Sequence, residues 1–214
     1  MLYIGIDLGT SAAKLLLVDD SGQVRNTVTK EYPLEFPQPG WSQQAPADWW
    51  RAVLTGVPEL TDGVDAGEIK GIGVGGQMHG LVAPDKDDQV IRPAILWNDG
   101  RTAKEVDYLN GTIGRETLSR CTANIAFAGF TAPKLLWMKA NEPENFARIE
   151  KIMLPKDYLV YRLTGVHATD YSDASGTLLL DVEHKRWSRE MCGICGISVA
   201  SYPDSMKAGR LWAP

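Results

Sequence analysis

The sequence predicts an α/β fold on three observations. Short apolar runs at the start of the chain have the length and residue types of β-strands. An amphipathic segment follows them, with large apolar residues at helical spacing. A further apolar run then ends in a pair of glycines. Strands, a helix and another strand in this order are typical of a sheet covered by helices.

The first three strands are expected at Leu2–Ile6, Ala13–Val18 and Val24–Thr29. A turn at Asp19–Gly22 joins the second strand to the third, because Asp, Ser and Gly are typical turn residues between strands. Short connections join antiparallel neighbours, so the three strands should form an antiparallel meander.

The helix is expected to begin near Pro46, since proline is favoured in the first helical turn and the acidic Asp48 is favourable there. One face of this helix is apolar and carries Trp49, Val53, Val57 and Leu60.

The next strand, Ile69–Val74, runs into Gly75 and Gly76, which completes the order expected of a ribonuclease-H-like layer. The rest of the chain is more helical, and we interpret residues 1–214 as one domain with a helical insertion. The later elements are a hairpin-like pair at Gly80–Ala83 and Val90–Ile91 with its turn at Asp85–Asp88, strands at Ala94–Trp97, Ile152–Leu154 and Ser175–Asp181, and helices at Arg101–Leu109, Ile113–Ser119, Ala132–Ala140, Pro143–Ile149, Lys156–Leu163 and Trp187–Met191.

Composition indicates a globular protein that is able to bury a core. Of its 214 residues, 44% are hydrophobic and 23% are charged. A net charge of −5 and the lack of a Lys/Arg cluster argue against a nucleic-acid partner. No apolar run approaches a membrane span, and no signal-peptide pattern precedes the first strand. The sequence predicts a cytoplasmic protein with no membrane partner and leaves the oligomeric state open, a homodimer included.

The three cysteines, Cys121, Cys192 and Cys195, argue against a disulfide framework because their number is odd. Cys192 and Cys195 have the spacing of a redox or zinc motif. Zinc needs two further ligands, however, and the nearby His184 has no suitable companion. We therefore interpret both cysteines as small apolar residues beside a turn.

The turn after the first strand has the chemistry of a phosphate-binding loop. Gly9 allows a tight turn and a close approach of an anion to the backbone amides, and Thr10 and Ser11 add hydroxyl donors. Asp7, at the end of the strand, is suited to hold Mg²⁺ directly or through water, because hard cations prefer carboxylate oxygens. The same residues are equally compatible with an ordinary β-hairpin turn.

Two polar loops that follow predicted strands are candidates for substrate binding, since ligands gather beyond strand ends in open α/β sheets. One loop contains Gln77, Met78 and His79, where an amide and a neutral imidazole offer directional hydrogen bonds to a polyhydroxyl ligand. The other contains Asp99, suited to accept from sugar hydroxyls or to hold Arg101. The alternatives are a capped turn with a structural histidine and a helix start with Arg101 exposed.

Several glycine-rich, tryptophan-containing and polar segments lie in a distinctive order along the chain. They are Gly5–Ser11, Gly40–Gln44 with Trp49-Trp50, Gly76–Gly80, Ile95–Arg101, Gly129–Trp137, Leu154–Leu159 and Ser172–Thr177. The polar loop Thr169–Thr177, which contains the last of these segments, indicates only turn and capping chemistry by itself. In this order they resemble the FGGY family of carbohydrate kinases over nearly the whole chain, and most closely its xylulose kinases. The Gln77–Gly80 loop favours these over the glycerol kinases.

This resemblance implies an actin-like, two-domain kinase fold with this chain as the amino-terminal domain. Asp7 matches the family's metal- and phosphate-organising aspartate. Gly9, Thr10 and Ser11 match the first phosphate loop, and Lys14 lies where a basic side chain approaches the transferred phosphate.

The resemblance also implies a sugar site. Met78 and His79 match the family's sugar contacts, next to Gln77. The loop with Asp99 and Arg101 borders the same cleft.

The implied reaction is the phosphorylation of D-xylulose to D-xylulose 5-phosphate with ATP and Mg²⁺. Family members are considerably longer, with an adenosine pocket on a second domain, and their general base is expected beyond Pro214. The chain alone is therefore expected to be inactive. The alternatives are a kinase for another sugar such as ribulose, L-xylulose or gluconate, a catalytically dead sugar-binding module, and a non-sugar actin-like ATPase domain.

Overall fold

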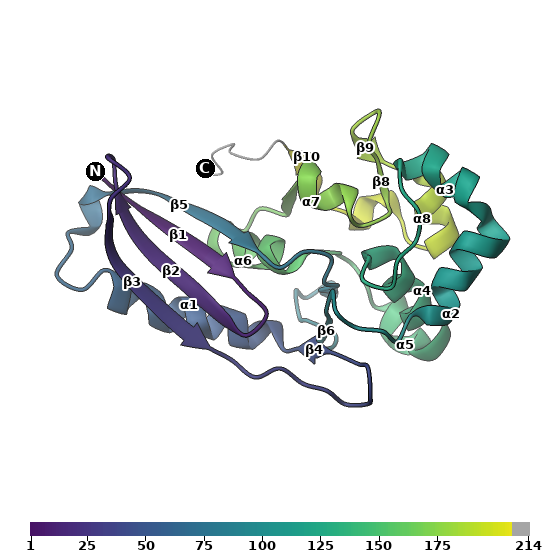
Figure 1. The fold of residues 1–214 in the computed structure, drawn as a ribbon, viewed down its shortest axis with the longest axis horizontal. Helices are drawn as coiled ribbons and strands as arrows, with labels where there is room; N and C mark the ends of the chain where they lie inside the picture. Colours follow the sequence, from purple (N-terminus) through teal and green to yellow (C-terminus); the bar gives the residue numbers. More distant parts are fainter. Residues whose placement is uncertain (207–214) are drawn as a thin grey trace.

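A four-stranded sheet forms one end of the molecule, at the left of Figure 1. The computed structural model describes residues 1–206. The strands are β1 (Leu2–Leu8), β2 (Ala12–Asp19), β3 (Val24–Glu31) and β5 (Ile69–Gly76), in the order β3-β2-β1-β5. β2 pairs antiparallel with both β1 and β3, whereas β1 and β5 are parallel. The predicted meander and the ribonuclease-H-like order are confirmed.

The side chains of β1 alternate between the two faces of the sheet, as strand geometry requires. Ile4, Ile6 and Leu8 are buried in the core, whereas Tyr3 and Asp7 are exposed on the opposite face. The strand therefore presents Asp7 to the surface from a backbone fixed by apolar packing.

Two helices cover the core face of the sheet. Helix α1 (Pro46–Leu60) packs on β2 and β3, and α6 (Pro155–Thr164) packs on β5 and on α1. Trp49 and Leu60 of α1 are fully buried, which confirms the predicted apolar face.

The other end of the molecule is mainly helical and has a second hydrophobic core. Its helices are α2 (Ala103–Asp107), the π-helical segment η2 (Tyr108–Gly114), α3 (Arg115–Thr122), α4 (Thr131–Asn141), α5 (Pro143–Ala147), α7 (Tyr171–Ser175) and α8 (Arg189–Cys195). The smaller elements are β4 (Gln43–Gln44) paired with β6 (Ala94–Ile95), β7 (Ala168–Asp170) with β10 (Asp204–Met206), β8 (Leu180–Asp181) with β9 (Arg186–Trp187), and the 3-10 turns η1 (Ala66–Glu68) and η3 (Val199–Ser201).

Two predicted strands are wrong. Ile152–Leu154 makes only an isolated bridge, to Val82. Only the last two residues of Ser175–Asp181 form a strand. Leu178 adopts a left-handed φ of 63°, which interrupts extended backbone although its side chain is apolar and buried.

Other predicted elements are shorter than expected. The hairpin-like pair is reduced to one bridge between Pro84 and Val90, although the turn at Asp85–Asp88 forms. The strand expected at Ala94–Trp97 ends after two residues, and the helix expected at Arg101–Leu109 is divided between α2 and η2. Within residues 1–206, none of the helices is both long and apolar enough to span a bilayer.

Candidate active site

The turn between β1 and β2 is held by side chains that donate hydrogen bonds to its carbonyl oxygens. The Gly9 oxygen accepts from the Tyr32 hydroxyl (2.5 Å), and the Thr10 oxygen accepts from Nε2 of Gln44 (2.6 Å). A trans peptide directs its N–H opposite to its C=O, so the N–H groups of Thr10 and Ser11 are directed away from these inner partners. Outward amides beside two hydroxyls suit an anion such as phosphate.

The buried Gln44 side chain links this turn to the loop that follows β5. Its Oε1 accepts from Nε1 of Trp49 (3.0 Å) and from Nε2 of Gln77 (3.1 Å). Its Nε2 also donates to the Pro33 carbonyl (3.1 Å), and the backbone N–H of Gln77 donates to the Leu8 carbonyl (2.7 Å). The neighbouring ends of β1 and β5 are therefore joined by one hydrogen-bond network.

Gln77 is buried but only partly paired. Its Nε2 is engaged, whereas its Oε1 has no hydrogen-bond partner among residues 1–206. A buried polar atom left unpaired costs about 1–3 kcal/mol. The next residue, Met78, is 50% exposed. The loop thus combines a buried, unpaired acceptor with an exposed, adaptable apolar side chain.

Asp7 lies on the exposed face of β1, opposite Lys14 on β2 and Gly75 on β5. Among residues 1–206 its carboxylate accepts no hydrogen bond and forms no ion pair. Burial and the nearby Asp7 charge raise the pKa of Tyr32, so this hydroxyl remains a donor to the Gly9 carbonyl.

A magnesium ion fits this carboxylate better than a metal that needs a full protein cage. Residues 1–206 contain no group of three or more His, Cys, Asp or Glu side chains arranged to hold a metal. Mg²⁺ usually keeps several waters and takes one or two carboxylates together with substrate phosphates. Asp7, which has no hydrogen-bond or ion-pair partner within residues 1–206 and lies next to the phosphate turn, provides that kind of ligand.

His79 is fixed by contacts to its ring and by an unusual backbone. Its φ of 63° is left-handed, which few residues other than glycine adopt. Its ring lies 4.8 Å from the Phe130 ring and against Gly176, where an added Cβ would come within 2.2 Å of the imidazole. Burial and the Lys134 charge lower the pKa of His79, while Asp173 acts in the opposite direction. At neutral pH the ring is therefore neutral and able to donate and accept.

Asp99 and Arg101 form a buried ion pair (2.8 Å) behind the second candidate loop. The Arg101 guanidinium lies over the rings of Trp41 (4.0 Å) and Trp137 (5.0 Å), and the Asp99 carboxylate also accepts from the Ser42 backbone (2.5 Å). The alternative of an exposed Arg101 is wrong, because neither side chain reaches the surface. Of the two roles considered for Asp99, the structure favours the one that holds Arg101.

Comparison with known proteins identifies the family. Residues 2–213 match the model of the FGGY family of carbohydrate kinases, N-terminal domain. The chain belongs to this family. It is 44% identical to the xylulose kinase of Escherichia coli (strain K12) over 202 residues, which cover 94% of this chain and 41% of that relative.

Solved structures of FGGY relatives have the same fold. A crystal structure of a xyloylose kinase from Brucella ovis matches with a TM-score of 0.91 and 42% identity, over 96% of this chain and 43% of that one. A gluconate kinase from Lactobacillus acidophilus matches with a TM-score of 0.94 and 29% identity, over 100% of this chain and 43% of that one. The chain therefore spans less than half the length of the relatives it matches.

Trp97 is a candidate site residue of this FGGY chain that the sequence reasoning did not single out. It is 46% exposed, and its Nε1 donates to the Thr10 hydroxyl (3.1 Å), so it lies beside the phosphate turn. A tryptophan in an apolar strand is usually buried, and nothing in the sequence indicates that this one is not. Gln44 and Tyr32 were missed for a related reason, since their partners are distant backbone carbonyls.

A buried lysine forms a cluster of ion pairs next to the candidate site of this FGGY chain. The Lys156 ammonium contacts the carboxylates of Asp157 (2.6 Å), Asp170 (2.8 Å) and Asp173 (3.3 Å), which joins α6 to β7 and α7. These acidic groups raise the pKa of Lys156 despite its burial. Asp170 also caps α7 by accepting from the Asp173 backbone, which confirms the capping role predicted for the Thr169–Thr177 segment.

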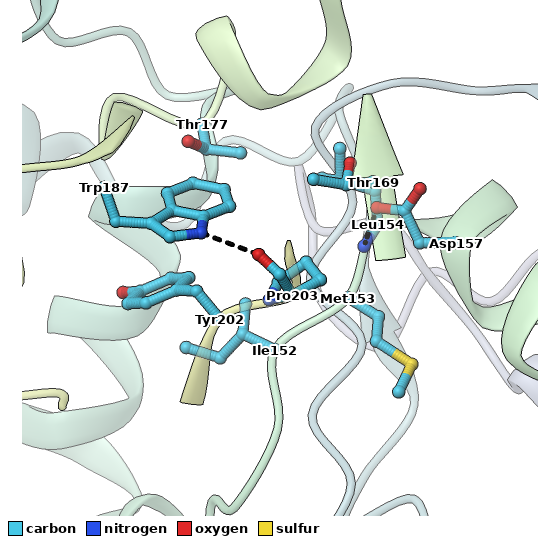
Figure 2. A pocket seen from close by; sticks show the side chains of 9 residues that line it. All are labelled: Ile152, Met153, Leu154, Asp157, Thr169, Thr177, Trp187, Tyr202 and Pro203. Carbon is cyan, nitrogen blue, oxygen red and sulfur yellow. Dashed lines mark hydrogen bonds between the residues drawn. The ribbon is translucent and has the colours of Figure 1, made fainter. Parts of the chain in front are cut away.

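A small cavity is lined by Asp157 of this cluster and by Thr169 and Thr177, but not by Asp7, His79 or Lys156 (Figure 2). Its volume of about 10 Å³ holds no more than a single water molecule. Trp187 and Tyr202 stack on one side of it, with ring centroids 4.8 Å apart, and Nε1 of Trp187 donates to the Pro203 carbonyl (2.7 Å). The cavity is too small for a sugar or a nucleotide.

The cysteine pair of this FGGY chain has no sign of metal or redox chemistry. Cys192 and Cys195 are buried in α8, and burial raises the pKa of their thiols to about 11 and about 12. Such thiols are weak nucleophiles and weak metal ligands at neutral pH. They act as small apolar core residues, although they lie inside a helix and not beside a turn.

Proposed function

We propose that this chain supplies the phosphate-organising and sugar-binding part of an ATP-dependent xylulose kinase. The complete enzyme would convert ATP and D-xylulose to ADP and D-xylulose 5-phosphate. Membership of the FGGY family and 44% identity to a xylulose kinase support the reaction class. The chain spans about 41% of that relative, so the proposal extends to the activity, substrate and partners of the whole protein.

The observation that carries the proposal is the network through Gln44. It joins the outward-facing amides of the Thr10 turn to the loop that bears Gln77 and His79. A kinase needs its phosphoryl donor and its acceptor hydroxyl held next to each other, because positioning provides much of the rate enhancement. One rigid network beneath both loops meets that requirement.

The phosphate side of the proposed site consists of neutral donors, one carboxylate and one lysine. The amides and hydroxyls of Thr10 and Ser11 would bind phosphate oxygens, and Gly9 lets them approach. Asp7 would hold Mg²⁺, which neutralises phosphate charge when bound. Lys14, opposite Asp7 in the strand pair, lies on the same face and would add a positive charge near the transferred group.

The sugar side of the proposed site is polar with apolar walls. Neutral His79 would donate or accept through Nε2, since its Nδ1 is buried, and Gln77 would reach a ketose hydroxyl with its buried, unpaired Oε1 only by a change of side-chain position. Met78 and Trp97, both about half exposed, would pack against the carbon skeleton. Asp99 and Arg101 would stabilise the Trp97 loop from behind without contacting the sugar.

Binding by the 214-residue chain tests the sugar site directly. We expect D-xylulose to bind weakly and saturably in calorimetry, and His79→Ala to weaken this binding at least tenfold. His184→Ala is the matched control, since His184 is exposed and, in the part of the chain that the structure describes, pairs only with Asp181. Equal affinity of the His79→Ala chain and the unchanged chain would contradict the sugar role of His79.

The same chain should show no ADP production with MgATP and D-xylulose. The general base and the adenosine pocket are proposed to come from segments that this chain does not contain. Losing the positioning of one substrate alone removes about 7–11 kcal/mol of barrier lowering. Steady xylulose-dependent turnover in a coupled ADP assay would show that the base lies within these 214 residues.

Gluconate is the second candidate substrate, because a gluconate kinase structure matches the whole chain with a TM-score of 0.94. Gluconate carries a carboxylate, to which the proposed sugar side, with Gln77, neutral His79, Met78 and Trp97, offers no positive charge. Titrating D-xylulose, D-ribulose, L-xylulose and gluconate into the same preparation ranks them. Tighter binding of gluconate than of any ketose would replace the xylulose proposal.

A further inference from the structure

Lys134 is a fully buried lysine without a carboxylate partner in contact among residues 1–206. Its ammonium donates to the backbone carbonyls of His79 (2.8 Å) and Gly129. Burial lowers the pKa of Lys134 to about 7, and only Asp99 acts on it from a distance in the opposite direction. Burying an ammonium without a counter-ion is costly, so its presence needs an explanation beyond packing.

The carbonyl that Lys134 binds belongs to the most constrained residue of the sugar loop. His79 holds a left-handed φ of 63°. Such a conformation costs on the order of 1 kcal/mol and persists only where the surroundings enforce it. Thr131 donates its hydroxyl to the same carbonyl (3.2 Å), so the first turn of α4 supplies two donors to one oxygen.

The imidazole of His79 is restricted as well. Phe130, which precedes α4, packs against one part of the ring, and Gly176 leaves the space that the ring occupies. With the carbonyl and the ring both held, the direction of the side chain is determined. A lysine at position 134 is therefore placed to control the orientation of His79 without touching a ligand itself.

We propose that Lys134 is a positioning residue: by holding the His79 carbonyl, it aims the His79 imidazole at the sugar. This inference rests on the proposed function, since it assumes that His79 contacts the sugar. An apolar residue of similar length would fill the same volume but would leave two backbone carbonyls with fewer donors. The lysine is retained, in this view, for the hydrogen bonds that its ammonium makes.

The test compares three variants of the 214-residue chain. Lys134→Met removes the donors and keeps the volume, and Thr131→Val removes only the weaker donor to the His79 carbonyl. Lys139→Met, at an exposed position later in α4, is the matched control. Histidine labelled with ¹⁵N gives ring signals for His79, His167 and His184 that report on each side chain separately.

We expect the His79 ring signals of Lys134→Met to shift or broaden and the pKa of His79 to rise, because a nearby positive charge is removed. The signals of His167 and His184 should not change. The dissociation constant for D-xylulose, measured on the folded fraction, should rise at least tenfold. Thr131→Val, which removes no charge, should produce smaller changes in the His79 ring signals and in the dissociation constant, and Lys139→Met should produce none.

A residue with a merely structural role would lower the melting temperature but leave the affinity of the folded fraction unchanged, whereas the pKa of His79 would rise in either case because the Lys134 charge is lost. That result for Lys134→Met would overturn the proposal. If Lys134→Met does not fold, unchanged His79 signals and affinity in Thr131→Val would overturn it. Failure of the unchanged chain to bind xylulose would instead contradict the proposed function.

Discussion

The Asp7 turn and the His79 loop lie at neighbouring strand ends, yet they are held in different ways. The turn is bound by neutral donors, Tyr32 and Gln44, which are 23 and 34 residues away from their acceptors. The loop is bound by a buried ammonium, Lys134, 55 residues away, and by the space left at Gly176. Both arrangements depend on the tertiary fold, but only the second depends on a buried charge.

This difference determines how each part responds to change. Removing one neutral hydrogen bond lowers the free energy of unfolding by about 1 kcal/mol. Such a bond is insensitive to pH near neutrality. A buried charge makes the loop sensitive both to the loss of partners and to proton concentration. Substitutions at the turn should therefore affect ligand binding and turnover more than stability. Substitutions of the buried charges that hold the loop should lower the free energy of unfolding.

The largest effect is expected from Asp7→Asn in a full-length kinase that contains this chain. The amide keeps the shape but removes the negative charge proposed to hold Mg²⁺, so turnover should fall at least a hundredfold, or about 2.7 kcal/mol of barrier. Asp20→Asn, at an exposed turn position, should leave turnover unchanged. Near-normal kcat and magnesium dependence in Asp7→Asn would contradict the assignment.

The next largest effect, a loss of unfolding free energy, is expected from Lys156→Met in the cluster of ion pairs next to the candidate site. Asp157 is fully buried and would lose its cation, and breaking a buried pair in this way costs about 3–5 kcal/mol. Lys151→Met, which breaks a more exposed pair with Asp88, should cost less than about 1 kcal/mol. Urea unfolding of both variants measures the difference, and equal losses would remove the distinction between the two regions.

The same contrast explains what the sequence predicted. Register and turn chemistry are local, so alternation in β1 and the residues after Asp7 indicated the sheet and the phosphate turn. The left-handed Leu178, the division of a helix at Tyr108 and the burial of Arg101 between two tryptophans depend on distant packing. No local pattern contains that information, because the partners are brought together only by the fold.

The candidate site was predictable to the extent that its residues carry distinctive chemistry. Asp7 and His79 were singled out as candidates from residue type and from their positions at the end of a strand and in the loop after one. Lys134 was not, because a lysine on a helix is normally exposed, and only the structure shows that it lies inside. Gln44 was not, because its four hydrogen bonds join segments that are separate in the sequence.

A smaller effect, specific to the loop, is expected from pH. Lys134 has a pKa of about 7 in the fold against an ordinary value of 10.5, so its contribution to stability is fully present above 10.5 and is lost as the pH falls towards 7. The groups that act on it are Asp99, Arg101 and His79. The unchanged chain should therefore gain stability relative to Lys134→Met between pH 7 and pH 10.

Urea midpoints at four pH values across that range provide the measurement. The thiols and the other lysines titrate in both proteins, so their contributions cancel in the difference between the two curves. A difference that does not vary with pH would mean that Lys134 is not in the low-dielectric environment that separates the loop from the turn.

The smallest effect is expected at the turn, from Tyr32→Phe. The substitution removes the hydroxyl that donates to the Gly9 carbonyl and changes little else, so it should cost about 0.5–1.5 kcal/mol of unfolding free energy. Because burial raises the pKa of Tyr32, its hydroxyl stays protonated and the cost should be the same at pH 6 and pH 9. Tyr3→Phe is the matched control: Tyr3 is exposed on the Asp7 face, and the same loss of a hydroxyl there should change stability by less than about 0.5 kcal/mol. A Tyr32→Phe cost that grows with pH would show that the turn, like the loop, depends on a titrating group, and the comparison between the two would no longer hold.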